Sequence, residues 1–259
     1  MKPILSLLVC VAVLAAQYLP SGGIRRIGGG NNVSVVSGHV GGTGGGSSAT
    51  SVYNMGGATM TAGNTIFCGV FVNVYPGPFT AAQMTKTAGT ATIGTVALDG
   101  SIPNTSYTSL AFYRIPVTGT GTLTLTYNPG SSYYQLIGCG EFTGVNSSPV
   151  STTAGNASNT SGALHSTGSV SSTDLGVMIY LAMENPATNF TRSWSDVIIF
   201  HIDTGSSTAT GIIQYKIINA SPNTMQDCTG ATPVLPGGAC NTGGFSGAWT
   251  CMWQLYKSS

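Results

Sequence analysis

The sequence has very little charge. Lys and Arg together number eight and Asp and Glu seven, which makes 6% of the 259 residues, whereas an average soluble domain has about 25%. The basic residues are scattered, and only Arg25 and Arg26 are adjacent. No basic stripe is available to neutralise phosphates, so we expect no nucleic-acid partner.

The chain also lacks the local patterns of enzymes and metalloproteins. It has no C-x-x-C or Cys/His spacing typical of a metal site and no G-x-S-x-G nucleophile turn. His201 and Asp203 could serve a Ser/His/Asp site, and Glu141 and Glu184 could face each other as in a glycosidase. The structural alternatives are a surface pair for His201 and Asp203, and a Glu141 that binds backbone groups at a corner of the fold. We favour these alternatives and expect no enzyme, no metal and no cofactor.

The N-terminal segment is apolar. Lys2 precedes the apolar run Ile4–Ala16, which is interrupted only by Ser6. This pattern favours a signal peptide or a hydrophobic anchor over residues 1–20. Residues 21–48 are rich in Gly and predict a flexible linker. The folded domain is then expected over residues 49–259, with two subdomains split near residue 150 as the alternative.

The rest of the chain is rich in strand signals separated by turn residues. Residues 65–75 form a run apolar enough to be buried on both faces, and in residues 122–126 leucines alternate with threonines. Residues 107–115 and 121–127 are expected to pair as a hairpin. We find no amphipathic helix, apart from a turn near residues 81–84. The prediction is an all-β protein, an antiparallel two-sheet sandwich with jelly-roll or immunoglobulin-like character.

Five cysteines remain once the leader is set aside. Cys228 and Cys240 flank a loop rich in Pro and Gly and are the first candidates for a disulfide. Cys68, Cys139 and Cys251 each lie in an apolar, strand-like run. Two of these three could bridge sheets, or all three could be buried thiols.

Aromatic residues are the best candidates for ligand contact. A neutral protein would bind a sugar through exposed Trp or Tyr faces helped by amide and hydroxyl groups. Trp194 lies in a polar stretch, and Tyr75, Tyr107 and Tyr133 lie near the ends of expected strands. Packing over the end of a sheet is the structural alternative for each of them.

Several short motifs recur in a recognisable order. A turn at Ala62-Gly63-Asn64 precedes a strand, and Glu141-Phe142-Thr143-Gly144-Val145 is followed by Pro149. A second turn and strand begin at Ser172-Thr173-Asp174-Leu175, and a Trp-containing strand, Trp249 to Lys257, comes last. Over residues 50–257 the chain resembles β-sandwich modules of bacterial secreted proteins and phage structural or decoration proteins. The resemblance implies an adhesive, stalk, decoration or glycan-contacting domain.

These observations predict a non-enzymatic module displayed on a virion or a cell surface, where it serves assembly, decoration or attachment. Its expected partners are copies of itself, other surface or capsid proteins, and glycans. The alternative in the binding class is a secreted carbohydrate-binding module, and a glycan hydrolase is the less favoured enzyme alternative. The expected location is extracellular or the virion surface.

Overall fold

The computed structural model describes ten stretches of the chain. They are residues 32–75, 77–158, 170–172, 175–185, 197–203, 210–218, 223–225, 228–229, 232–233 and 248–259. All of them belong to the unit Asn31–Ser259. The predicted leader, residues 1–20, lies outside the described residues.

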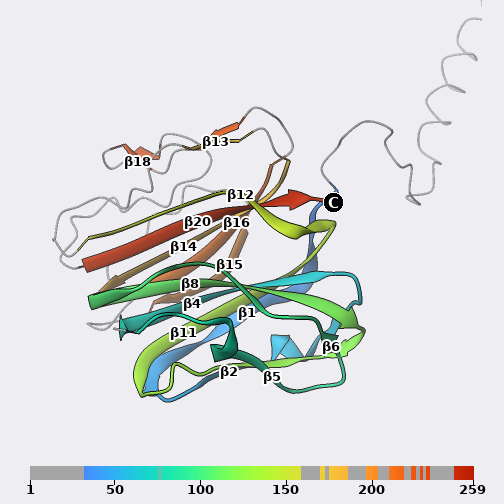
Figure 1. Ribbon diagram of the computed structural model, residues 1–259, viewed down its shortest axis with the longest axis horizontal. Coiled ribbons are helices and arrows are strands. Elements are labelled where there is room, and N and C mark those ends of the chain that lie inside the picture. Colours follow the sequence, from blue (N-terminus) through green and yellow to red (C-terminus); the bar gives the residue numbers. More distant parts are fainter. Residues whose placement is uncertain are drawn as a thin grey trace, which may run out of the picture. The chain divides into compact units, whose positions relative to one another are not determined.

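The described residues form an antiparallel β-protein (Figure 1), which confirms the predicted all-β class. The six-stranded central sheet has the order β1-β11-β4-β8-β6, and β7 pairs with β8. Its strands are β1 (Ser34–Ser48), β4 (Thr65–Tyr75), β6 (Thr92–Ile93), β7 (Ala97–Ile102), β8 (Asn104–Gly119) and β11 (Tyr133–Thr143).

Two further sheets accompany the central sheet. The small sheet has the order β2-β10-β5, and the C-terminal sheet has the order β12-β20-β14-β16-β15. The strands of the small sheet are β2 (Ser51–Tyr53), β5 (Met84–Ala88) and β10 (Thr124–Tyr127). The strands of the C-terminal sheet are β12 (Val145–Ser158), β14 (Gly176–Asn185), β15 (Val197–Asp203), β16 (Thr210–Ile218) and β20 (Ala248–Ser258).

Short elements complete the described fold. Three two-stranded pairs are β3 (Thr59–Met60) with β9 (Gly121–Thr122), β13 (Val170–Ser172) with β17 (Asn223–Met225), and β18 (Cys228–Thr229) with β19 (Thr232–Pro233). Two single 3-10 turns are η1 (Met55–Gly57) and η2 (Ala81–Gln83). The turn η2 confirms the one predicted near residues 81–84. In the described stretches, no helix is long and apolar enough to span a membrane.

Strand β4 is buried on both of its faces, as its sequence predicts. Ile66, Cys68, Val70 and Val72 belong to one hydrophobic cluster, the first core, which also contains residues of all three strands of the small sheet. The alternate residues Phe67 and Phe71 belong to a second cluster, the second core. Because side chains alternate along a strand, β4 contributes to a core on each side of the central sheet.

The second core lies between the central sheet and the C-terminal sheet. Val177, Ile179 and Leu181 of β14 join the phenylalanines of β4 there. The ring of Phe67 stacks on that of Tyr256 from β20, with 3.8 Å between the ring centroids. Gly69 allows this approach, because a Cβ atom there would overlap Leu181 Cδ2.

The Gly-rich segment was predicted as a linker, and this prediction is wrong for residues 34–48. These residues form β1, which pairs with β11 from Ser34 opposite Thr143 to Ser48 opposite Tyr133. A Gly-rich composition predicts a linker because glycine has no side chain to bury in a core. A strand at the edge of a sheet is held by backbone hydrogen bonds, which glycine makes as well as any other residue.

The predicted hairpin between residues 107–115 and 121–127 is also wrong. Strand β8 pairs with β4, β6 and β7, whereas β10 pairs with β2 and β5 of the small sheet. The predicted alternation holds only in part: Leu123 and Leu125 are buried in the first core and Thr122 is exposed, but Thr124 is half-buried and Thr126 is buried. The chain leaves the central sheet after β8, so these leucines reach the first core from its opposite side.

Candidate functional site

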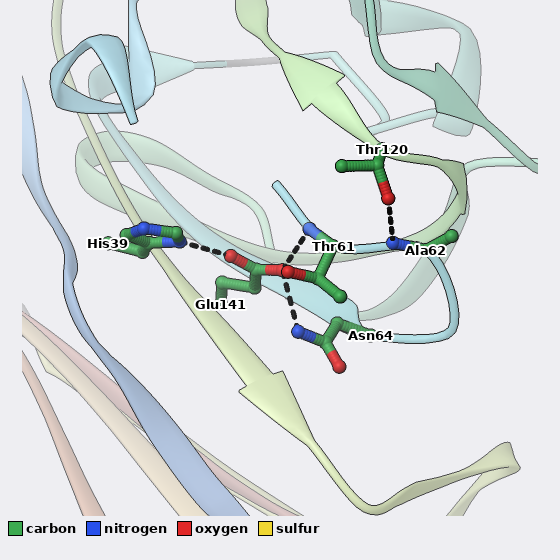
Figure 2. A network of polar contacts seen from close by, with 6 residues as sticks. All are labelled: His39, Thr61, Ala62, Asn64, Thr120 and Glu141. Atoms are coloured by element: carbon green, nitrogen blue, oxygen red, sulfur yellow. Dashed lines mark hydrogen bonds and ion pairs between the residues drawn. The ribbon is translucent and has the colours of Figure 1, made fainter. Parts of the chain in front are cut away.

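A polar cluster surrounds the carboxylate of Glu141, which is fully buried on β11. Its Oε1 accepts hydrogen bonds from the Thr61 backbone N–H at 2.8 Å and from Asn64 Nδ2 at 2.7 Å. Its Oε2 contacts His39 Nδ1. Figure 2 shows these groups converging on the carboxylate. Both carboxylate oxygens therefore have partners, as a buried charge requires.

The turn at Thr61–Asn64 is fixed on the central sheet. The Asn64 backbone N–H donates to the Thr61 carbonyl at 3.2 Å, and Gly63 has a φ of +91°, which glycine adopts without strain. The Gly63 N–H donates to the Val117 carbonyl, and the Val117 N–H donates to the Asn64 carbonyl, each at 2.9 Å. These bonds to β8 hold the Asn64 amide in reach of Glu141.

His39 reaches Glu141 from an irregular part of β1. The pairing of β1 with β11 shifts register between Val35, opposite Phe142, and Val40, opposite Gly140. Glu141 lies opposite this shift. The His39 side chain is 17% exposed, whereas that of Glu141 is 0% exposed. The cluster thus links β1, β11 and the Thr61–Asn64 turn through one buried acceptor.

A second polar cluster lies where β7 and β8 meet β20. Arg114 donates to Asp99 through Nε at 2.8 Å and through Nη2 at 3.4 Å. The Gln254 Nε2 donates to the Asp99 backbone carbonyl at 3.0 Å. This two-bonded Arg–carboxylate geometry is the strong form of an ion pair, and Gln254 connects it to the C-terminal sheet.

Tyr256 is completely buried beside this ion pair. Burial raises the pKa of its phenol well above 10.0, the Asp99 carboxylate raises it further, and Arg114 opposes the rise. Among the described residues, the Tyr256 hydroxyl and Gln254 Oε1 have no hydrogen-bond partner of normal geometry. The Tyr256 phenol is therefore protonated and neutral at neutral pH, because burial disfavours the phenolate.

A disulfide joins Cys68 and Cys139, two of the predicted candidates. The two residues are register partners on β4 and β11, with their Cα atoms 4.1 Å apart, and both are fully buried in the first core. The bond therefore links neighbouring strands of one sheet instead of bridging two sheets. Cys240 and the side chains of Cys228 and Cys251 lie outside what the structure describes, so the Cys228–Cys240 pair stays a prediction.

The predicted ligand-binding aromatics are only partly covered. Trp194 lies outside the described residues, and Tyr75 and Tyr107 are placed only as backbone positions of β4 and β8. Tyr133, at the start of β11, is half-buried and packs against the first core. The ligand role of all four stays a prediction.

The two carboxylates considered for glycosidase chemistry lie on strands of different sheets, and the side chain of Glu184 lies outside what the structure describes. Glu141 is on β11 of the central sheet, and Glu184 is on β14 of the C-terminal sheet. His201 and Asp203 lie on β15. Where side chains are described, no group of three His, Cys, Asp or Glu residues is arranged to hold a metal ion.

One structural role predicted for Glu141 is confirmed, since its carboxylate binds the Thr61 backbone N–H. Sequence reasoning missed His39, because the linker prediction removed it from consideration. It also missed the Asp99–Arg114 pair, whose members lie 15 positions apart without a motif. The motifs at residues 62–64 and 141–145 gave a usable signal, because they meet in the Glu141 cluster.

A scan against protein-family models finds no match for the sequence. Searches of curated proteins and of solved structures find no significantly similar chain.

Proposed function

We propose that this chain is a non-enzymatic structural module, displayed outside a cell or on a virion, that assembles with copies of itself or with other surface proteins. The observation that carries the proposal is the use of its carboxylates. The described acidic side chains, Asp99 and Glu141, are both engaged in buried contacts that join separate strands. Both acids thus join parts of the fold through buried contacts, which is the use of carboxylates expected in a structural module.

The cysteine chemistry supports an extracellular setting. Disulfides form and persist in oxidising compartments and are rare in the cytosol. The Cys68–Cys139 bond is compatible with an extracellular protein. The leader predicted over residues 1–20 would deliver the chain there as a signal peptide or hold it as an anchor.

The architecture supports a sandwich of the kind used by surface modules. The central and C-terminal sheets bury the second core between them, as two packed sheets do in β-sandwiches. We propose that these sheets form the jelly-roll or immunoglobulin-like unit and that the small sheet covers the opposite face of the central sheet.

The low charge favours lateral packing between neighbouring modules. A surface with few ions has little electrostatic repulsion to overcome and few charges to desolvate when it meets another copy. Of the described large hydrophobic residues, Val52 alone is strongly exposed, at 53%. The contact is therefore expected to use hydroxyl, amide and backbone groups rather than an apolar patch.

The test is the native mass of the purified full-length chain, measured by light scattering at about 1 to 50 µM. We expect an assembly of two or more chains. A single-chain mass over the whole range would refute self-association. The same sample applied to a broad glycan array tests the carbohydrate-binding alternative, which predicts binding that Trp194→Ala abolishes.

A further inference from the structure

Strand β1 lies at one edge of the central sheet, where β11 is its strand partner. Six of its fifteen residues are glycine, and glycine brings no side chain to a core. At its glycine positions, β1 is therefore held by its backbone ladder with β11.

This ladder is interrupted twice. The register shifts between Val35 and Val40 and again between Gly44 and Gly46. At the first shift, the contact of His39 with the buried Glu141 is a side-chain link between the two strands. Close to it, Val33 is buried and Val35 half-buried in the second core. A strand whose ladder is interrupted has a low free-energy cost of local opening at the interruptions.

The connection from β1 to the next strand is very short. β1 ends at Ser48 and β2 begins at Ser51, so only Ala49 and Thr50 lead from the central sheet into the small sheet. A short hinge between elements of different sheets favours domain swapping, because the chain relieves the tight connection when it straightens.

We propose that β1 is exchanged between two copies of this chain. Ser34–Ser48 of one copy pairs with β11 of the other, and His39 of one copy contacts Glu141 of the other. This inference rests on the proposed self-association and names its partner as a second copy. Every bond of β1 is remade in the exchange, so the equilibrium depends on the hinge and on the cost of association.

A disulfide between β1 and β11 tests the exchange. Ser34 and Thr143 are register partners at the end of the ladder far from the hinge, and Ser34 is exposed and Thr143 half-exposed. Paired strand positions have the Cα spacing that a disulfide needs. We would oxidise the full-length Ser34→Cys/Thr143→Cys variant and analyse it by non-reducing electrophoresis and peptide mapping. Each single variant controls for the native cysteines.

The expected result is a covalent dimer in which positions 34 and 143 are linked, absent from both single variants. The proposal is overturned if the bond closes within one chain, or if no bond between the two positions forms. Light scattering on the wild type separates the two proposals. If the wild type assembles but the bond in the variant forms within one chain, the strand exchange is overturned and self-association stands. If the wild type has the mass of a single chain, both the exchange and self-association are overturned.

A change in the hinge gives an independent test. Four residues, Gly-Ser-Gly-Ser, are inserted between Ala49 and Thr50, which leaves both strands and the His39–Glu141 contact intact. The longer connection lets β1 fold back onto its own chain without a tight turn. We expect dimerisation at least about tenfold weaker than in the wild type, and an unchanged dimer fraction would contradict the exchange.

Discussion

The Glu141 cluster should be the most sensitive polar site of the described fold. In Glu141→Leu, the Thr61 N–H and the Asn64 amide lose their acceptor, and His39 loses its partner. Each donor left without its acceptor in a buried site costs about 1–3 kcal/mol. His39 is partly exposed and can be hydrated, so the other two donors account for most of the loss. We expect Glu141→Leu to lower the free energy of unfolding by about 3 kcal/mol.

Glu141→Gln separates geometry from charge. The glutamine Oε1 can still accept from Thr61 and Asn64, and its amide can donate to the Nδ1 of a neutral His39. This variant loses only the charge of the acceptor. A hydrogen bond to a charged group is about twice as strong as a hydrogen bond between neutral groups. The expected loss is about 1 kcal/mol.

Equilibrium urea unfolding, followed by tryptophan fluorescence, measures these differences. Val52→Thr, at an exposed position, is the control and should stay within about 0.5 kcal/mol of the wild type. A Glu141→Leu variant as stable as this control would refute the reasoning. A glutamine variant as damaged as the leucine variant would show that charge, rather than the set of acceptors, is decisive.

Three further predictions concern the cores. Replacing Cys68 and Cys139 with Ala opens a loop of 71 residues' separation and should cost about 4 kcal/mol; a loss below about 1 kcal/mol in urea unfolding would contradict the chain-entropy argument. Gly69→Ala should lower the free energy of unfolding by about 1–3 kcal/mol, because the new methyl group overlaps Leu181. The loss in the double variant Gly69→Ala/Leu181→Ala should be smaller than the sum of the losses in the two single variants. A double-variant loss equal to that sum would show that the two sheets do not meet there. Above pH 10.0 the unfolded chain loses the phenol proton that folded Tyr256 keeps. Stability should therefore fall by up to about 1.4 kcal/mol per pH unit, and Tyr256→Phe should remove that part of the slope in unfolding measured from pH 8 to 11; an unchanged slope would count against the buried phenol.

Local patterns were enough to predict the kind of structure but not its pairing. The burial of β4 on both faces and the buried leucines at positions 123 and 125 follow from alternation within a few residues. The partners of β8 and β10 do not, because pairing depends on which sheet each strand enters, and no local signal encodes that choice. The same limit applies to Cys68 and Cys139, where burial was predictable and adjacency was not.

The polar clusters show a similar division. A glutamate in a nearly uncharged sequence can be expected to have a structural partner, and one donor to Glu141 is a backbone N–H. His39 was missed because a Gly-rich composition predicts a linker, whereas edge-strand pairing needs only backbone groups. Asp99 and Arg114 are brought together by strand register, which sequence spacing alone does not reveal.

The burial of β4 on both faces also determines how the described fold should unfold. Strand β4 contributes side chains to both the first core and the second core. Unfolding of either core displaces β4 and therefore exposes the other core to solvent. Loss of either side should therefore bring down both in one cooperative transition. The amide protons at the middle of β4 should exchange with solvent only through that global event, and more slowly than those of the interrupted ladder of β1.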